Sequence, residues 1–353
     1  MDISKRVYFQ RRSRSIFPIS KEFTLKFDMV AEGGGVKIPA LAGAYEAVVN
    51  KGFEPSHCAG TSAGAILAAV VAAGYEPDEV KKIVMGTDFS QFTDGGKTLA
   101  SKLWNLTFHN GIYKGDAFLD FIRETLAAKN IHTFKDLRYE DEGTKYRYRL
   151  KVMASDITSS SLISLPHDIA NYGMEPDDLE VALAVRMSMS IPLFFRPVII
   201  DPKTEEVSNT LTKVNNIGNL KTKHAIVDGG LLSNFPIWCW DDPDEPQWPT
   251  FGFLLYEDKE DKPRKTNNPI NLTSAIFATM MKAHDKQFIR PDDYINRTIS
   301  IPTGNVSSID FNLTNQRKAW LYKQGVESAT EFLEGWSWNR YKRWAINSRS
   351  RNL

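Results

Sequence analysis

The pentapeptide Gly60-Thr61-Ser62-Ala63-Gly64 places a serine where a short strand-like stretch gives way to an alanine-rich helical stretch. This G-x-S-x-G pattern is typical of a strained strand-to-helix turn that exposes a nucleophilic serine. Small residues are needed two positions before and after the serine, because larger ones would collide with the neighbouring strand and helix. The alternative is a turn in which Ser62 only caps the helix. The context favours a nucleophile, which indicates covalent catalysis at a carbonyl group.

A serine hydroxyl becomes an effective nucleophile only when a base accepts its proton. None of the six histidines has a sequence signature of that base. The stretch VDGGLLSNFP offers Asp228 instead, at the end of an apolar strand and followed by Gly229 and Gly230, which allow a sharp turn. A buried acid is costly unless it is used or paired, so Asp228 is the candidate base. Its alternative role is a turn cap.

Three consecutive glycines, Gly33, Gly34 and Gly35, lie between the first strand-like stretch and a helical one. A turn without side chains can approach either a phosphate or a negatively charged oxygen atom. A dinucleotide-binding G-x-G-x-x-G pattern needs glycine at position 38, where this chain has Ile38, and no Lys-Ser/Thr ending marks a phosphate loop. The phosphate alternative is therefore the weaker one, and we expect these N–H groups to face an oxyanion.

The three motifs, in this order on a chain of alternating strands and helices, resemble those of the patatin-like phospholipase family in its bacterial form. The resemblance extends from about Phe27 to Tyr256. It includes residues 184–198, AVRMSMSIPLFFRPV, which are similar to the family segment that packs beside the nucleophile. Many relatives have glycine after the basic residue, where this chain has Ile38 and then Pro39. This departure concerns the angle at which the first helix begins and not the N–H groups of the glycine turn.

The resemblance implies a role for each motif. It implies an oxyanion hole at a G-G-G-x-[RK] turn, matched here by residues 33–35 and Lys37, whose alternative is an ordinary surface lysine. It implies that Ser62 is the nucleophile and Asp228 the base of a Ser-Asp dyad without histidine. The supporting glycines are Gly60 and Gly64 at the serine turn and Gly229 and Gly230 after the aspartate.

The resemblance implies a lipid acyl hydrolase that cleaves carboxylic esters of phospholipids or lysophospholipids through an acyl-enzyme. An ordinary aspartate has a pKa of about 3.9, against about 6.5 for histidine, so it is the weaker base. Desolvation under bound lipid would raise its pKa, and an ester has a less demanding leaving group than an amide. We expect no cofactor, no metal ion and no calcium requirement. The alternatives are an acyltransferase or neutral-lipid esterase on the same dyad, and a signal-gated effector silent until a partner or nucleotide binds.

The elements that must position these residues alternate along the chain between strand-like and helix-like patterns, which predicts an α/β fold. We expect a three-layer α/β/α sandwich with a mainly parallel central sheet, as in the patatin-like family. The predicted strands are 24–31, 55–59, 148–155, 224–230 and 249–257, and the predicted helices are 39–52, 63–74 and 116–130.

The 353 residues, 42% of them hydrophobic, suit one large core or two small ones. Residues 201–223, rich in Asn, Lys and Thr, read as a surface insertion. We divide the chain into a basic N-terminal arm at 1–22, a catalytic domain at 23–257, a helical extension packed on it at 258–335, and a basic aromatic tail at 336–353.

The net charge of +1 conceals two basic ends. Residues 1–21 hold six basic side chains and one acidic, and residues 335–353 hold five basic and none acidic, so the body between them is −9. The tail's aromatic residues alternate with its cations, a mixture suited to an anionic membrane surface. The alternative is that the aromatic rings pack on the domain. We expect a lipid ester substrate and no nucleic-acid partner.

Two cysteines, Cys58 and Cys239, make no disulfide framework and fit no metal-ligand spacing, which points to a reducing compartment. The longest apolar run, residues 63–74, is shorter than the roughly 20 residues of a membrane-spanning helix. The N-terminus has no apolar signal core. We therefore expect a cytoplasmic protein, at most peripheral at the inner membrane face.

Overall fold

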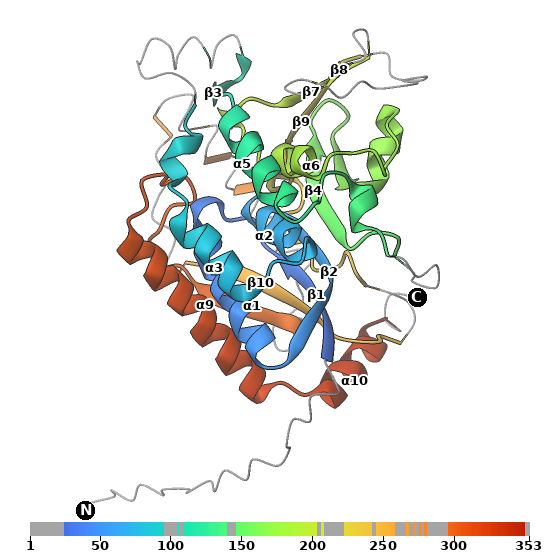
Figure 1. The fold of residues 1–353 in the computed structure, drawn as a ribbon, viewed down its shortest axis with the longest axis vertical. Coiled ribbons are helices and arrows are strands. Elements are labelled where there is room, and N and C mark those ends of the chain that lie inside the picture. The colour runs from blue at the N-terminus through green and yellow to red at the C-terminus, as the bar shows by residue number, and fades with distance from the viewer. Residues whose placement is uncertain are drawn as a thin grey trace, which may run out of the picture.

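A mixed sheet with mainly parallel strands forms the centre of the protein (Figure 1). The structure is a computed structural model that describes residues 25–94, 105, 109–139, 146–202, 206–207, 222–241, 245–257, 266–267, 272, 275–276, 279–280 and 296–349. The predicted N-terminal arm lies outside the described residues, as does most of the predicted insertion at 201–223.

The strands of this sheet lie in the order β11-β10-β1-β2-β4-β9-β7-β8, with β5 paired to β4. The first five run parallel to one another, whereas β5, β9 and β7 pair antiparallel with their neighbours. Their bounds are β1 Leu25–Ala31, β2 Phe53–Thr61, β4 Leu150–Asp156, β5 Ser161–Leu165, β7 Val198–Asp201, β8 Glu206–Val207, β9 His224–Asp228, β10 Thr250–Tyr256 and β11 Thr298–Pro302. Two further strands, β3 Gly111–Tyr113 and β6 Leu193–Phe195, form a separate parallel pair.

The two faces of the sheet bury different sets of side chains, because neighbouring residues of a strand point to opposite sides. Helices cover one face, where Phe27, Met29 and Phe251 join the larger apolar core. On the other face, Val30 and Leu254 pack against residues 235–240. The helices are α1 Ile38–Asn50, α2 Ala63–Ala72, α3 Pro77–Gly86, α5 Asp116–Ala127, α6 Val181–Ser188, α9 Asn315–Gly335 and α10 Trp338–Arg349.

The predicted three-layer α/β/α class, with a mainly parallel sheet, is confirmed. All eight predicted elements are present with small shifts at their ends, the largest being β2, which is four residues longer than the predicted strand 55–59. The region 258–335, predicted to be helical, also contains β11, which pairs with β10 and so continues the sheet. Among the described residues, no helix is both long and apolar enough to cross a membrane.

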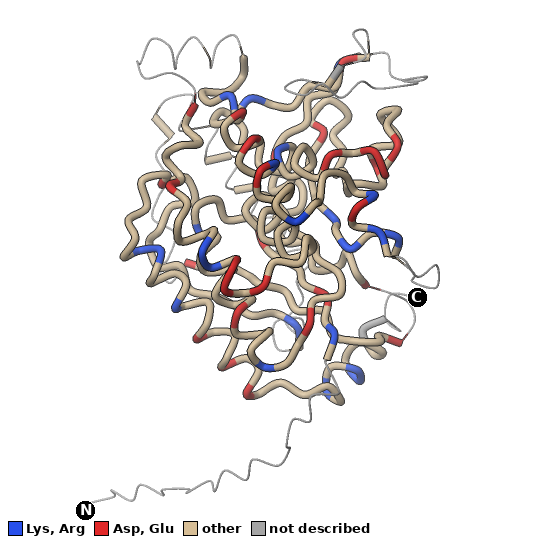
Figure 2. Tube along the Cα trace, in the orientation of Figure 1, with Lys and Arg blue, Asp and Glu red and all other residues tan. Residues whose placement is uncertain are grey.

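The C-terminal helix α10 packs its aromatic side chains on the domain. Tyr341 is 3% exposed and accepts a hydrogen bond from the Thr250 N–H, and Trp336, which lies between α9 and α10, donates from its indole to the Asn296 carbonyl. Rings of Trp338 and Tyr341 stack with centroids 5.5 Å apart. Basic and acidic residues are interspersed along the described chain (Figure 2), but α10 itself holds no acidic residue. Its aromatic residues are therefore largely engaged, and what it offers solvent is chiefly basic and polar.

Helix α9 lies along α1, and two glycines allow the close approach (Figure 1). A Cβ on Gly43 would lie 2.0 Å from the Tyr322 carbonyl oxygen, and one on Gly325 would lie 1.9 Å from the Ala40 oxygen. Because both obstacles are backbone atoms, no side-chain rotation can relieve the clash. The helix that leads away from the glycine turn is thus held by the C-terminal region.

We therefore expect Gly43→Ala to lower the thermal midpoint of unfolding, since an added methyl group in a packed interface costs about 1–3 kcal/mol. Gly86→Ala is the matched control, because no atom of the described residues outside its own helix and chain neighbours lies within 4 Å of the position of its Cβ. It should leave the midpoint unchanged or slightly higher. Thermal denaturation followed by circular dichroism compares the two, and equal midpoints would mean that the helices can separate without cost.

Candidate active site

Ser62 lies at the turn between β2 and α2, in the conformation that the G-x-S-x-G pattern predicts. Its φ of 54° and ψ of −124° are rare for a residue with a side chain. A Cβ on Gly60 would lie 2.3 Å from Gly64, and a Cβ on Gly64 would lie 2.1 Å from the Ala31 oxygen. The Ser62 side chain makes no capping hydrogen bond to α2, so the helix-cap alternative does not describe it.

The end of α6 and the residue that follows it contact the serine, as the resemblance implied for residues 184–198. The Ser62 N–H donates to Ser188 Oγ at 2.8 Å, and Ser188 Oγ donates to the Met153 carbonyl at 2.6 Å. The Ser62 hydroxyl donates to Met189 Sδ at 3.3 Å. Sulfur is a weak acceptor, so this proton can be redirected by rotation about the Cβ–Oγ bond.

Asp228 ends β9 and is 1% exposed. Its Oδ1 accepts a hydrogen bond of 2.7 Å from the Gly230 N–H, and its own N–H donates to the Ser190 carbonyl at 3.0 Å. Burial raises its pKa to about 7, although the hydrogen bond from Gly230 and the nearby Ser62 side chain act in the opposite direction. The carboxyl group thus caps a turn, as its alternative role required, and also has the proton affinity of a base that works near neutral pH.

The glycine turn lies directly beside the serine. A Cβ on Gly33 would lie 3.1 Å from the Cβ of Ser62. The Gly33 N–H is already engaged, because it donates to the Asn234 carbonyl at 3.0 Å. The N–H groups of Gly34 and Gly35 have no acceptor within the described part of the chain. Of the three predicted oxyanion donors, Gly33 is therefore occupied, and the other two are available.

Lys37 is not the surface lysine of the sequence alternative, nor does its charge face the serine unpaired. Its side chain is 7% exposed, and Nζ lies 3.3 Å from Glu257 Oε1 and 3.2 Å from Thr303 Oγ1. These partners follow β10 and β11, so the lysine ties the glycine turn to the end of the sheet. The sequence could not show this pairing, because it joins residues 220 and 266 positions apart.

Two histidines are paired with aspartates away from the serine. His57 Nδ1 lies 2.6 Å from Asp28 Oδ1, and His224 Nδ1 lies 2.6 Å from Asp156 Oδ2. No hydrogen bond joins any histidine to Ser62 among the described residues. Nor do the described residues bring together three side chains that could hold a metal ion.

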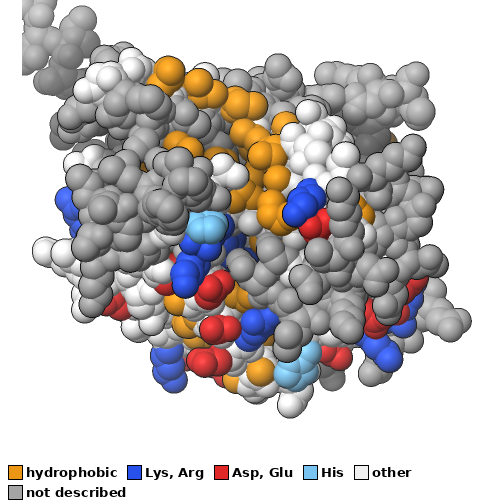
Figure 3. Space-filling view, turned by 90° about the horizontal axis from the view of Figure 1, so that it is seen from above, with side chains coloured by type: hydrophobic (Ala, Val, Ile, Leu, Met, Phe, Trp, Pro, Cys, Tyr) orange, Lys and Arg blue, Asp and Glu red, His pale blue; other side chains and the backbone are white. Residues whose placement is uncertain are grey.

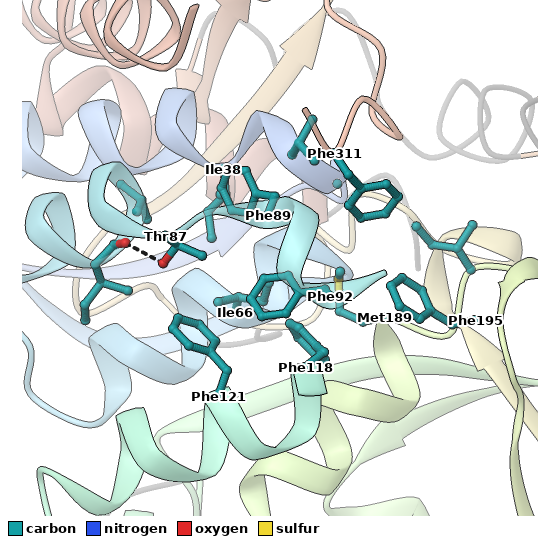
Figure 4. Close-up of a pocket in the computed structure, with 15 residues that line it drawn as sticks. Ile38, Ile66, Thr87, Phe89, Phe92, Phe118, Phe121, Met189, Phe195 and Phe311 are labelled. Atoms are coloured by element: carbon teal, nitrogen blue, oxygen red, sulfur yellow. Dashed lines mark hydrogen bonds between the residues drawn. The ribbon is translucent and has the colours of Figure 1, made fainter. Parts of the chain in front are cut away.

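An apolar pocket opens beside the serine turn (Figure 4). The space within it and at its open mouth is about 560 Å³, and its wall includes Gly35 from the glycine turn and Met189, which contacts the Ser62 hydroxyl. Thr87 is the one hydroxyl residue on its lining, and that hydroxyl donates to the Ile83 carbonyl at 2.7 Å. Six phenylalanines supply much of the wall, namely Phe89, Phe92, Phe118, Phe121, Phe195 and Phe311. The pocket can hold a hydrocarbon chain but offers no charged group.

Sequence reasoning did not assign Met189 or Asn234, which contact the serine and the glycine turn respectively. Met189 lies within the segment 184–198 that was expected beside the serine. Asn234 follows Asp228 by six residues in VDGGLLSNFP, and this short spacing was the one available signal.

This chain is similar in sequence to several known proteins. The sequence profile described as patatin-like phospholipase matches residues 29–238. Protein YqhO of Bacillus subtilis (strain 168) is 38% identical over 316 residues, covering 88% of this chain and 99% of YqhO. The probable lipid hydrolase 463L of Invertebrate iridescent virus 6 is 24% identical over 209 residues, covering 59% of this chain and 61% of that protein. The crystal structure of VipD from Legionella pneumophila superposes with a TM-score of 0.49 at 17% identity, covering 87% of this chain and 66% of VipD.

The raised pKa of Asp228 predicts a stability cost that depends on pH. The unfolded chain ionises this group near pH 3.8, whereas the folded chain holds it neutral up to about pH 7, so the cost grows between these values and then stays level. We expect Asp228→Asn to raise the thermal midpoint, little at pH 4 and most above pH 7. Above pH 7 the free energy of unfolding should increase by about 4 kcal/mol.

Calorimetry of both proteins between pH 4 and pH 8 measures this difference. The Asn side chain can still accept the hydrogen bond from Gly230, so the comparison isolates the charge. A gain that does not change with pH would show that Asp228 ionises normally in the folded protein.

Proposed function

Because this chain belongs to the patatin-like phospholipase family, we propose that it is a lipid acyl hydrolase that cleaves carboxylic esters of phospholipids or lysophospholipids with Ser62 as nucleophile and Asp228 as base. One observation carries the proposal: the serine on its strained turn has, as immediate neighbours, a carboxyl group with a pKa of about 7 and an apolar pocket. The name of the 463L relative supports lipid as the substrate class.

In the proposed reaction, Ser62 Oγ attacks the ester carbonyl carbon while Asp228 accepts the hydroxyl proton. The carbonyl oxygen becomes an oxyanion, which the N–H groups of Gly34 and Gly35 stabilise, together with the positive end of α2. The tetrahedral intermediate collapses to an acyl-enzyme, and Asp228 returns the proton to the departing alcohol. Water then attacks the acyl-enzyme with Asp228 again as base, releasing the fatty acid and the free serine.

The environment of Asp228 supports its use as the base. An aspartate with an ordinary pKa of about 3.9 would accept a serine proton poorly. A pKa of about 7 gives this carboxylate a proton affinity similar to that of histidine while leaving about half of it ionised at neutral pH. A histidine is therefore not needed to explain proton transfer at this site.

The apolar pocket supports an acyl chain as the part of the substrate that is recognised. Met189 and Gly35 line its wall beside the serine turn, and Ile83 and Val84 of α3 line it too. A chain that enters here would bury its methylene groups at about 0.8 kcal/mol each. The pocket has no charged lining, so the head group must remain outside it.

We also propose that the substrate is reached at an anionic membrane surface on the cytoplasmic side. Seen from above, the described part of the molecule gathers hydrophobic side chains in a band (Figure 3). Ile309 and Trp320 are each 39% exposed, and Ile309 follows Ser308, which holds the glycine turn through the Val36 N–H. Arg340 and Arg343 are exposed on α10, at the lower end of the molecule in Figure 1, and supply positive charge for anionic lipid at that end rather than on the face in Figure 3.

A fluorophosphonate probe tests the nucleophile. It should attach covalently to Ser62, because it forms a stable analogue of the tetrahedral intermediate, and Ser62→Ala should abolish both labelling and ester hydrolysis. Mass spectrometry of the labelled peptide identifies the serine. Ser161→Ala, at an exposed position on β5, is the control and should behave as the wild type. Attachment to a different serine would contradict the proposed function.

The pH dependence of kcat/KM tests the base. Because the catalytically active form of Asp228 is the carboxylate, kcat/KM should rise about tenfold per pH unit below pH 7 and level off above it. His57→Gln and His224→Gln should retain this profile if they fold. A profile that is level from pH 5 upward would remove Asp228 as the titrating base.

Substitution in the pocket tests the acyl site. Val84→Phe should fill part of the pocket and lower kcat/KM for long-chain esters more than for short-chain esters, by about tenfold or more. Met85→Phe, on the same helix but outside the lining, is the matched control and should not change the chain-length profile. A profile unchanged by Val84→Phe would place the acyl chain elsewhere.

A further inference from the structure

Residues Ser233 and Asn234 lie between the three parts of the site and contact each of them through the backbone. The Ser233 N–H donates to the Gly229 carbonyl at 2.8 Å, beside the candidate base. The Ser233 carbonyl accepts a hydrogen bond of 2.9 Å from Thr61 Oγ1, next to the nucleophile. The Asn234 carbonyl accepts the Gly33 N–H at 3.0 Å. This short segment therefore joins the aspartate turn, the serine turn and the glycine turn.

The Asn234 side chain adds a second contact with the glycine turn. It is 4% exposed, and its Nδ2 donates to Glu32 Oε1 at 2.9 Å and to the Gly33 carbonyl at 3.3 Å. Both partners are acceptors, so the amide cannot be reversed without placing its oxygen against two other oxygens. Among the residues that the structure describes, the buried Asn234 Oδ1 has no hydrogen-bond partner, which costs about 1–3 kcal/mol. The orientation is therefore set by the two donated bonds.

These contacts constrain the peptide group that joins Gly33 to Gly34. A trans peptide is planar, with its C=O and N–H pointing in opposite directions. Since the Gly33 carbonyl is held toward Asn234, the Gly34 N–H is directed away from Asn234. The Cα of Gly33 lies beside Ser62, because a Cβ on it would be 3.1 Å from the serine Cβ. The available N–H of Gly34 is thus fixed next to the nucleophile.

We propose that Asn234 is a positioning residue that aims the Gly34 N–H at the oxyanion formed on Ser62, an inference that rests on the proposed function. Asn234 does not touch the reacting atoms. It acts by clamping Gly33 on both sides, through its own carbonyl and its side-chain amide. Glu32 holds the amide in turn, and its other carboxylate oxygen accepts the Leu255 N–H from β10. The position of the Gly34 N–H is thereby fixed relative to the central sheet.

Asn234→Asp tests the clamp with little change in shape, because it replaces the donor Nδ2 by an acceptor. We expect kcat to fall by up to about 100-fold with KM changed less than threefold, since the lost alignment matters only when the oxyanion forms. The rate of Ser62 labelling by the fluorophosphonate probe should fall in parallel. Asn130→Asp is the matched control, because it makes the same substitution at an exposed position just after α5. It should retain wild-type kinetics.

The single variant also sets two carboxylates against each other at positions 32 and 234, which can lower stability. A second variant, combining Glu32→Gln with Asn234→Asp, restores this pair with donor and acceptor exchanged. The Gln amide can donate to the new carboxylate, and its oxygen can still accept the Leu255 N–H. The Gly33 carbonyl, however, remains without a donor. This variant therefore distinguishes a loss of stability in the turn from a loss of the orientation of the Gly34 N–H.

We expect the double variant to recover the thermal midpoint of the wild type but to keep the low kcat and slow labelling. Recovery of both kcat and labelling would overturn the inference, because Asn234 would then serve only as a partner for Glu32. Unchanged kcat in Asn234→Asp, or a change confined to KM, would also overturn it. Wild-type protein that is not labelled at Ser62 would instead contradict the proposed function, and the inference with it.

Discussion

The carboxyl group of Asp228 lies where water is excluded, and its pKa of about 7 follows from that exclusion. Burial of this kind requires a neighbouring strand and a close turn. β9 supplies the aspartate from its last residue, and β4 lies directly beside it, with Ala154 opposite Asp228. The following Gly229 passes so near β4 that a Cβ would lie 2.2 Å from the Met153 oxygen. The same Met153 oxygen accepts a hydrogen bond from Ser188, which holds the backbone of Ser62. The environment that raises the aspartate pKa and the contacts that hold the serine turn are therefore one packed unit.

Backbone strain at Ser62 persists because the surroundings determine it from several sides. A residue with a positive φ costs of order 1–3 kcal/mol, which the turn alone cannot offset. The Ser188 hydroxyl fixes the serine N–H, and Gly60 and Gly64 allow the strand and helix to meet without a clash. Strain held in this way keeps the serine side chain at the helix start rather than folded back as a cap. Packing contacts thus offset the backbone strain that sets the direction of the Ser62 hydroxyl group.

The parts of the site that the sequence predicted are those encoded within a few consecutive residues. The serine turn, Asp228 with its two glycines, and the triple-glycine turn each carry their own pattern, and all three meet in the structure. What it did not predict depends on contacts between distant residues. Lys37 is buried against Glu257, and the Gly33 N–H is occupied by Asn234, so both contacts join positions far apart in the chain. The strand β11 extends the sheet from beyond the recognised region. Local spacing cannot encode such pairings, because many strand orders and loop paths are compatible with it.

In the proposed dyad, desolvation raises the pKa of the base, and this has a consequence for the substrate. In a triad, a charged partner adjusts the histidine, and that adjustment is present whether or not substrate is bound. Here no cation is hydrogen-bonded to Asp228 among the described residues, so its proton affinity depends on how dry its surroundings are. In the proposed reaction, an acyl chain that fills the apolar pocket beside Met189 would keep water away from the serine turn and so preserve the proton affinity that burial gives Asp228. A short or polar ester would do this less. Chain binding and base strength would then be coupled through the same excluded water, which connects the proposed selection for lipid esters with a base that is not a histidine.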